Sequence, residues 1–197
     1  MSEFWVGIAI SGKMGSGKTT LADELIKQVH ESHPDVATKV SLAAPVKEVA
    51  YKYFLMPEDV KDRQLLQKIG QNFRHIKEDV WVDLMLNNVE ALTDTTSTDI
   101  VICDDMRFSN ELNVLKQDGW FIIRLTVDEE EQKRRLECAY GDSWTTHWEN
   151  RNEISETDLD NSEDFNMTLH NLPLEEVPFT ASEILETIHD WIRRPQP

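Results

Sequence analysis

Basic side chains are scarce in this chain. Its 197 residues include 20 Lys and Arg against 37 Asp and Glu, which gives a formal net charge of −17. The shortage is greatest near the end, because no Lys or Arg occurs between Arg151 and Arg193. A surface of this charge repels polyanions and argues against broad nucleic-acid binding. A small phosphorylated ligand needs only a local basic pocket, so it remains compatible with the composition.

Cysteines and long apolar runs are also few. Two cysteines, Cys103 and Cys138, are too few for a disulfide framework, and a reducing cytoplasm suits them best. No apolar run approaches the ~20 residues of a membrane span, and no signal-peptide pattern opens the chain. None of the six histidines has a metal-site spacing, so no zinc is assigned. We therefore expect a cytoplasmic globular protein that has no membrane partner.

The most specific feature present is a glycine-rich loop. Residues 12–19 read Gly-Lys-Met-Gly-Ser-Gly-Lys-Thr, which matches the phosphate-binding pattern G-x-x-x-x-G-K-[ST]. In such a loop backbone N–H groups cradle phosphates, Lys18 reaches the β- and γ-phosphates, and the Thr19 hydroxyl can ligate Mg²⁺. An apolar run precedes the loop, and a helical pattern follows it. We predict that ATP and Mg²⁺ bind here, with the contacts made by Gly12, Lys13, Met14, Gly15, Ser16, Gly17, Lys18, Thr19 and Thr20.

The order of elements predicts the fold class. Apolar runs indicate strands at about 4–11, 38–42, 99–103, 120–127 and 165–170. Helical patterns lie between them and at the end, to about 32 and over 45–55, 62–76, 79–92, 109–117, 129–140 and 180–194. Residues 141–164 lack periodicity, and we interpret them as a loop or lid. Alternating strands and helices predict a three-layer α/β fold whose roughly five-stranded parallel sheet binds ligands at its carboxyl edge.

The helix at 62–76 carries a second, polar stripe. Arg63, Gln67, Gly70 and Arg74 fall within roughly 60° of one another at 100° per residue, away from the apolar sector. Arginine grips phosphate in bidentate fashion, glutamine can read a base edge, and glycine lets a ligand approach the backbone. A solvated polar face with a tolerated glycine is the alternative. Beside a phosphate-binding loop, the stripe favours a substrate site.

Two further groups of charged residues could act on a phosphoryl group. Asp105 and Arg107 follow a buried strand, where a carboxylate can hold Mg²⁺ and a guanidinium can neutralise phosphate. Asp104 is the less certain member of the acidic pair, and an acid at a helix N-terminus is the alternative. Arg134 and Arg135 precede the expected lid and could stabilise charge on the phosphoryl group in transfer. Pairing of these arginines with Glu129–Glu131 along the helix is an equally good interpretation.

These residues together resemble the phage-type deoxynucleoside monophosphate kinases, within the P-loop nucleoside monophosphate kinase superfamily. The resemblance rests on the loop at 12–19, Ala44–Lys47, Leu66–Gly70 with Arg74 and Trp81, Asp105–Glu111, Ile122–Leu125 and Arg134–Leu136. It implies a single P-loop kinase domain over 1–197 with substrate-binding helices at about 45–92 and a lid at about 134–164. It also implies a substrate site of Lys47, Arg63, Gln67, Gly70, Arg74 and Trp81, and a phage-encoded protein in the host cytoplasm.

The resulting hypothesis is a kinase that transfers the γ-phosphoryl group of ATP to a (deoxy)nucleoside monophosphate. Its catalytic residues would be Lys18, Asp105, Arg107, Arg134 and Arg135, with Thr19 and Asp105 at the metal. One alternative is a kinase that phosphorylates hydroxymethylated pyrimidines in phage DNA, against which the net charge argues. Another is a nucleotide-dependent switch that has no acceptor. A homodimer is compatible with the sequence, which does not reveal the base preference.

Overall fold

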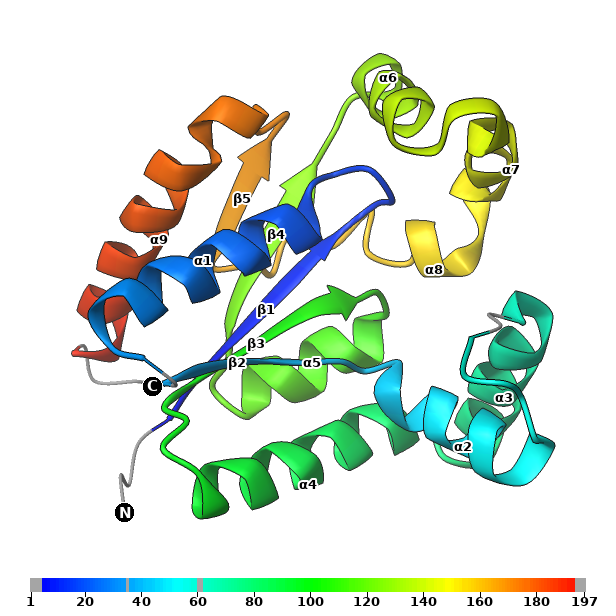
Figure 1. Ribbon diagram of the computed structural model, residues 1–197, viewed down its shortest axis with the longest axis horizontal. Helices are drawn as coiled ribbons and strands as arrows, with labels where there is room; N and C mark the ends of the chain where they lie inside the picture. Colours follow the sequence, from blue (N-terminus) through cyan, green and yellow to red (C-terminus); the bar gives the residue numbers. More distant parts are fainter. Residues whose placement is uncertain (1–4, 35, 60–61, 194–197) are drawn as a thin grey trace.

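Five strands form one parallel sheet at the centre of the molecule. The computed structural model describes residues 5–34, 36–59 and 62–193. The strands are β1 (Val6–Gly12), β2 (Ala37–Val40), β3 (Ile100–Met106), β4 (Phe121–Thr126) and β5 (Met167–His170). Their order is β2-β3-β1-β4-β5, and every pairing is parallel. The predicted sheet is confirmed, and because β1 is central, the loop that follows it lies in the middle of the carboxyl edge (Figure 1).

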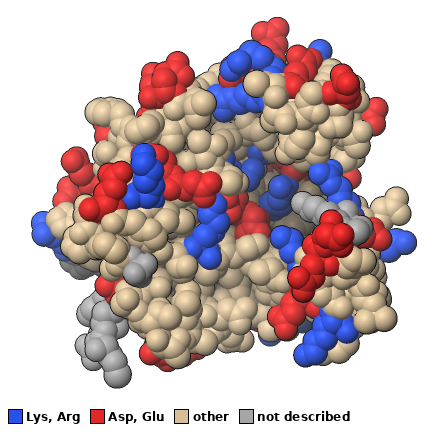
Figure 2. All heavy atoms as spheres, in the orientation of Figure 1, with Lys and Arg blue, Asp and Glu red and all other residues tan. Residues whose placement is uncertain are grey.

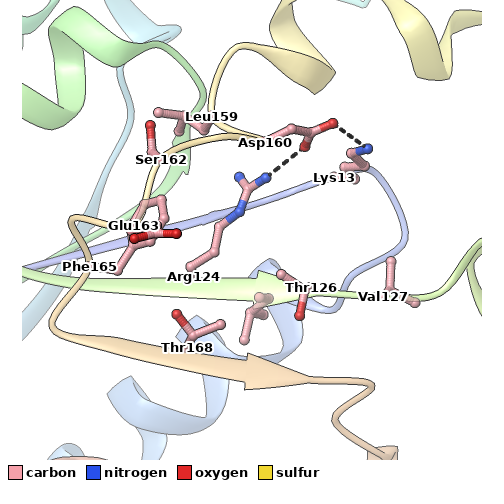
Figure 3. A pocket seen from close by; sticks show the side chains of 11 residues that line it. Lys13, Arg124, Thr126, Val127, Leu159, Asp160, Ser162, Glu163, Phe165 and Thr168 are labelled. Carbon is pink, nitrogen blue, oxygen red and sulfur yellow. Dashed lines mark hydrogen bonds and ion pairs between the residues drawn. The ribbon is translucent and has the colours of Figure 1, made fainter.

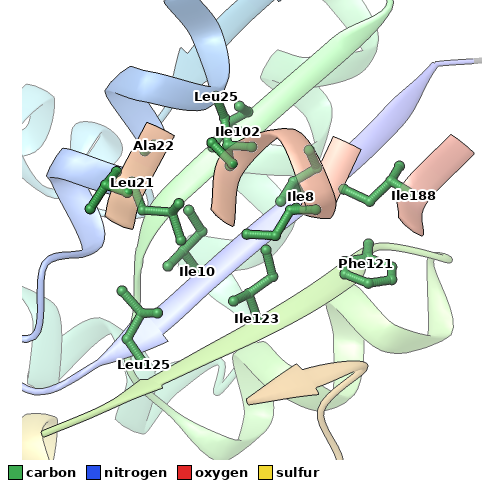
Figure 4. Close-up of a cluster of buried hydrophobic side chains, with 13 residues drawn as sticks. Ile8, Ile10, Leu21, Ala22, Leu25, Ile102, Phe121, Ile123, Leu125 and Ile188 are labelled. Atoms are coloured by element: carbon green, nitrogen blue, oxygen red, sulfur yellow. The ribbon is translucent and has the colours of Figure 1, made fainter. Parts of the chain in front are cut away.

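Alternation of side chains along each strand gives the sheet two apolar faces. Ile8 and Ile10 of β1 pack with α1 (Lys18–Ser32) and α9 (Val177–Ile192) on one face (Figure 4). Ala9 faces the other way, toward α4 (Val80–Thr95) and α5 (Ser109–Gln117). A strand buried on both faces must be apolar at every position, which explains the uninterrupted run before the loop. The fold is therefore a three-layer α/β sandwich.

Two helices project from this body beside the carboxyl edge. They are α2 (Ala44–Phe54) and α3 (Arg63–Ile76), and they share a small apolar cluster with the start of α4 (Figure 1). Pro45 suits the first turn of α2, where a backbone N–H has no helical partner. The Asp62 side chain caps α3 by accepting the Leu65 N–H at 3.0 Å. The cluster fixes one wall of the site described below.

The segment between α6 and β5 differs from its prediction as a loop. After α6 (Glu129–Tyr140) come the short turns η1 (Gly141–Ser143), α7 (Trp144–Glu149), η2 (Asn150–Asn152) and α8 (Ile154–Thr157). Elements this short cannot display an apolar period, so the sequence pattern did not reveal them. Ring stacking of Tyr140 on His147, at 3.8 Å between centroids, helps to hold them. We call residues 129–157 the α6–α8 segment.

Most remaining boundaries agree within a few residues, and three differences matter. Strand β3 continues to Met106 rather than ending at residue 103, so Asp104 and Asp105 lie within the strand. Helix α9 begins at Val177, with Pro178 in its first turn, rather than at 180, and the predicted end at Arg194 lies outside the described residues. Strand β5 starts at Met167 instead of 165. Among the described helices, none is both long enough and apolar enough to cross a bilayer.

Candidate active site

The glycine-rich loop has a backbone shape that its glycines make feasible. Gly17 adopts φ 98°, in the left-handed region, and α1 begins at the next residue. At Gly12 an added Cβ would lie 2.5 Å from Ser16 Oγ and 2.6 Å from the Leu125 carbonyl oxygen. A side chain at position 12 would therefore displace the loop from the end of β4. The loop consequently turns sharply into the α1 N-terminus, whose dipole favours an anion.

Lys18 lies folded over this loop. Its Nζ donates hydrogen bonds to the carbonyl oxygens of Gly12 at 2.6 Å and Lys13 at 2.9 Å. Burial, with a further contribution from the Arg107 charge, lowers the pKa of Lys18 to about 8, although Glu156 and Asp104 oppose this shift. An anionic ligand would favour the charged ammonium. Lys18 therefore lies at the loop with a lowered pKa, so that a bound phosphate would favour its protonated form.

The two acidic residues of β3 point to opposite faces. Asp105 shares the side of Cys103, and its carboxylate accepts hydrogen bonds from Ser41 Oγ at 2.6 Å and from the backbone N–H groups of Leu42 at 2.9 Å and Ala43 at 3.0 Å. These bonds hold the turn that leads into α2. These contacts give Asp105 a structural role, while its predicted role at the metal and in catalysis stays a prediction.

Asp104 is the acidic residue nearer the loop. It points to the face of α1, where it pairs with Lys39 at 3.3 Å, and its charge contributes to the pKa of Lys18. Thr19, at the start of α1, is exposed. Side chains alternate along a strand, so Asp104 lies on the same face as Ile102, and Asp105 lies on the opposite face. Asp104 therefore lies on the same side of the sheet as α1, at whose start Thr19 stands.

Arg107 extends from the end of β3 toward the α6–α8 segment. Its guanidinium forms an ion pair with Glu156 and donates from Nη1 to the Ser155 carbonyl oxygen at 3.3 Å. The second carboxylate oxygen of Glu156 accepts the Met14 N–H at 2.7 Å. Arg107 therefore lies at the loop, as predicted, with a buried carboxylate between it and the loop backbone.

The two arginines of α6 lie differently. Arg135 reaches the loop, where Nη1 donates to the Ser16 carbonyl oxygen at 3.3 Å, and its Nη2 donates to the Leu172 carbonyl oxygen at 2.9 Å. Arg134 is exposed and forms two hydrogen bonds with Glu131, each 2.7 Å long. Pairing along the helix holds for both arginines, because Arg135 Nε also donates to Glu131 Oε1 at 2.7 Å. Only Arg135 also contacts the loop, and the predicted action of both arginines on the phosphoryl group stays a prediction.

The polar stripe of α3 divides into two parts. Arg63 and Gln67 are exposed, and Gln67 Nε2 donates to Glu153 Oε2 at 3.0 Å, across to the α6–α8 segment. Arg74 instead binds the buried Glu111 at 2.9 Å, with its guanidinium 4.0 Å from the centre of the Phe108 ring. Burial raises the pKa of Glu111, while Arg74 and two backbone N–H groups oppose the rise. Arg74 is therefore engaged mainly in stabilising the start of α5, rather than in lining an open substrate site.

Two other predicted substrate residues are structural. Trp81 is 1% exposed, stacks on Phe73 and donates its Nε1–H to the Gly70 carbonyl oxygen at 3.0 Å. Gly70 is buried as well, and a Cβ there would lie 3.4 Å from Nη1 of Arg74. Both residues are buried here, and their predicted contact with a substrate stays a prediction. Lys47 on α2 is half-buried at the edge of this wall.

Lys13 turns away from the α3 side of the site. Its Nζ pairs with Asp160 at 2.7 Å, and Asp160 also binds Arg124 at 3.1 Å (Figure 3). These residues border a cavity of about 410 Å³ between the end of β4 and the 159–165 chain. Arg124 is 6% exposed, and Ser11 Oγ accepts another of its hydrogen bonds at 2.8 Å. Lys13 can therefore contribute its backbone, but not its side chain as placed, to a phosphate.

The described residues fit a nucleotide and a divalent cation. The loop presents backbone, Lys18 and the α1 N-terminus, and Thr19 with Asp104 offers oxygen ligands of the type that Mg²⁺ prefers. Figure 2 shows Lys and Arg side chains gathered about a hollow between the α6–α8 segment and the α2–α3 pair, while groups of acidic side chains are scattered over the outer surface. The strongly acidic chain thus retains a basic cleft, as a small anionic substrate requires.

A phosphate-binding loop after the central strand of a parallel sheet, with helices on both faces, defines a P-loop kinase-like nucleotide-binding fold. The family model described as AAA domain matches residues 8–158, and the chain belongs to this family. A search among curated proteins produced no match.

Solved structures share this fold at low sequence identity. TT1252 from Thermus thermophilus has 16% identity and a TM-score of 0.62, with 94% of this chain and 98% of that chain covered. APE1195 has 18% identity and a TM-score of 0.52, with the same two coverages. Shikimate kinase from Acinetobacter baumannii, solved in complex with shikimate, has 12% identity and a TM-score of 0.50, covering 98% and 97%. These likenesses establish the fold and leave the acceptor open.

Sequence reasoning ranked Asp104 below Asp105 and did not assign a role to Glu111 or Glu156. Asp104 could have been chosen by counting strand alternation from Ile102, had the longer strand been recognised. Glu111 is a capping-type glutamate in the first turn of α5, with its Oε2 accepting the Phe108 N–H at 3.1 Å. Glu156 belongs to the segment without periodicity, and no local signal brings it to Met14, which is 142 residues away.

Proposed function

We propose that the protein transfers the γ-phosphoryl group of ATP to a (deoxy)nucleoside monophosphate. The observation that carries the proposal is the arrangement of two unlike walls around one basic hollow. One wall is the phosphate-binding loop with Lys18, and the other is α3, which contacts the α6–α8 segment through Gln67 and also carries the exposed Arg63. A donor phosphate fits the first wall, and an acceptor that bears both an anion and a hydrogen-bonding ring fits the second.

The residues have separate tasks in this reaction. Loop N–H groups and Lys18 hold the donor phosphates, Thr19 and Asp104 hold Mg²⁺, and Arg107 offsets charge near the loop. Bound Mg²⁺ supplies neutralisation of phosphate charge. Arg63 and Lys47 attract the acceptor phosphate, while Gln67 offers an amide to the base. An acceptor phosphate is already ionised near neutral pH, so orientation and electrostatics suffice without a strong general base.

The α6–α8 segment, residues 129–157, would act as the lid of this site, and it overlaps most of the predicted lid range of about 134–164. Its support is the set of contacts it makes with the loop, through Gln132 to the Met14 carbonyl oxygen at 2.8 Å and through Arg135 to Ser16. A lid excludes water and favours transfer over hydrolysis. A single kinase domain, a phage origin and the host cytoplasm remain predictions of the resemblance, and a homodimer remains compatible with the sequence.

The test is an acceptor panel. Protein, Mg²⁺ and γ-labelled ATP are incubated with each ribo- and deoxynucleoside monophosphate, with duplex DNA containing hydroxymethyluracil, and with no acceptor. The proposal expects label in soluble nucleoside diphosphates. Label in DNA alone would support the DNA-modifying kinase, and slow hydrolysis that no acceptor stimulates would support a nucleotide switch. Either result would overturn the proposal.

A further inference from the structure

Glu156 is a buried carboxylate placed between parts of the phosphate-handling machinery. Its side chain is 3% exposed, although it belongs to α8, a helix of only four residues. One carboxylate oxygen accepts the Met14 N–H at 2.7 Å, and the other pairs with Nη1 of Arg107. The two donors come from the loop after β1 and the end of β3. The carboxylate therefore lies where two strand ends of the sheet converge.

The partners of Glu156 are the kinds of donor that bind phosphate. Backbone N–H groups of glycine-rich loops and guanidinium groups both bind phosphate oxygens in proteins. Lys18 lies within electrostatic range as well, because the charge of Glu156 acts to raise the pKa of Lys18 against the lowering effects of burial and Arg107. A loop amide, a guanidinium and an ammonium therefore surround one anion.

We propose that Glu156 and the phosphoryl group in transfer compete for a single anion site, formed by the Met14 N–H and Arg107. This inference rests on the proposed function, because it requires a nucleotide on the loop. Without nucleotide, the carboxylate satisfies both donors and keeps Arg107 at the loop. When nucleotide binds, a phosphate oxygen takes the Met14 N–H and the guanidinium, and Glu156 withdraws.

The architecture permits this exchange to be local. Helix α8 is one turn, so it has little cooperative structure of its own to lose. The rest of the α6–α8 segment and the chain after it keep separate contacts with the loop, through Gln132 to Met14, Arg135 to Ser16 and Asp160 to Lys13. Withdrawal of Glu156 can thus leave the lid in place while it frees Arg107. Glu156 would be a positioning residue that delays the use of Arg107 until a phosphate is present.

The competition predicts a gain of affinity on mutation, whereas a purely structural role predicts a loss or no change. Removal of a competing intramolecular anion increases the fraction of protein that is ready to bind, and apparent affinity rises with that fraction. A charge-assisted hydrogen bond is strong enough for an effect of about tenfold. Glu156→Gln is the test variant, and Glu153→Gln is its matched control, because Glu153 lies on the same segment and contacts Gln67 rather than the loop.

The experiment titrates the full-length wild type and both variants with a non-hydrolysable ATP analogue and with tripolyphosphate. We expect Glu156→Gln to bind both ligands about tenfold more tightly and Glu153→Gln to bind within about twofold of wild type. Tripolyphosphate lacks a base, so an equal gain for both ligands assigns the effect to the phosphates. Unchanged or weaker binding by a folded Glu156→Gln protein would overturn the inference.

Two controls separate this inference from the proposed function. If wild type binds neither ligand, or binds them equally well after Lys18→Ala, the proposed function fails with it. If binding depends on Lys18 and Glu156→Gln shows no gain, only the competition fails. Should Glu156→Gln not fold, Glu156→Asp decides the question by the same criteria, because its shorter side chain keeps the charge but spans the two donors poorly.

Discussion

The two walls of the cleft are built in different ways. The donor wall comes from one short stretch, where β1, the glycine-rich loop and α1 follow one another and the loop backbone alone sets the geometry. The proposed acceptor wall combines the consecutive helices α2 and α3 with the α6–α8 segment, which lies far along the chain and meets α3 through the contact of Gln67 with Glu153. A wall coded locally can be recognised in the sequence, whereas a wall assembled from distant helices depends on tertiary packing.

The largest expected effect is the loss of phosphoryl transfer when Lys18 in the donor wall is replaced. Lys18→Ala should lower phosphoryl transfer by on the order of 10²–10³, because an electrostatic contact at the developing charge is lost. Turnover with saturating ATP and acceptor measures it, and circular dichroism checks the fold. Lys27→Ala is the matched control on α1, since Lys27 is exposed and pairs with Glu24 one turn away. Near wild-type turnover in folded Lys18→Ala protein would contradict the assignment of the protein as a kinase.

A second pair of variants sharpens the boundary of the donor wall at β3. Asp104→Asn should reduce Mg²⁺-dependent turnover by about tenfold or more with little change in stability, because its pair with Lys39 is partly exposed. Asp105→Asn should instead lower the free energy of unfolding by about 2 kcal/mol, because its carboxylate holds the turn at Ser41–Ala43.

Activity assays and chemical denaturation of both β3 variants separate the two roles. If Asp105→Asn keeps its stability and loses metal dependence, the assignment of the two carboxylates is reversed. Equal loss of activity in both variants, with neither destabilised, would mean that strand alternation does not distinguish them.

Mutations in the acceptor wall should change the KM for the acceptor and leave the affinity for ATP unchanged. Arg63→Ala should raise the acceptor KM by about tenfold and leave nucleotide affinity unchanged, because one charge-assisted phosphate contact is removed from α3. Lys68→Ala on the same helix is the control, since Lys68 is exposed and off the polar stripe. Loss of ATP affinity in Arg63→Ala, or no change in acceptor kinetics, would contradict a substrate site on α3 and favour a solvated polar face.

Arg74 provides a contrast within that same helix. Arg74→Ala leaves the buried Glu111 without its guanidinium partner, which costs about 3–5 kcal/mol in typical buried pairs. Unfolding measurements should therefore reveal a stability defect that Arg63→Ala lacks. This difference follows from packing, since both arginines belong to the same stripe when the sequence alone is considered.

The smallest expected effect is a pH dependence of nucleotide binding. The pKa of Lys18 is lowered to about 8, and a bound anion favours the charged form, so affinity should be constant below pH 7 and fall as pH rises above 8. The same shift makes the free energy of unfolding increase between pH 8 and the ordinary lysine pKa, because the unfolded chain binds more protons there.

Calorimetric titration across this pH range measures the dependence of nucleotide binding. Lys18→Arg should remove the decline in affinity, because a guanidinium stays charged. A decline that persists in Lys18→Arg protein would assign the titration to another group.

The sheet and its helices were largely predictable, and the cleft only in part. Buried parallel strands are rich in apolar residues, so β1, β3 and β4 could be recognised, and α5 and α6 agree with their predicted bounds. The short helices of the α6–α8 segment carry no such period. Trp81 and Gly70 lie on predicted helices, yet their burial depends on how α3 meets α4. Residue type and spacing located Arg107 and Lys18, but not the carboxylates that surround them.

The most direct test of the two-wall account is the rate of ADP formation with and without a nucleoside monophosphate. The account predicts that an acceptor stimulates ADP formation many-fold and that nucleoside diphosphate appears in equal amount. Lys18→Ala should abolish the stimulation, and Arg63→Ala should shift it to higher acceptor concentration. ADP formation that is insensitive to every nucleoside monophosphate, in protein that binds ATP through Lys18, would contradict the existence of an acceptor wall.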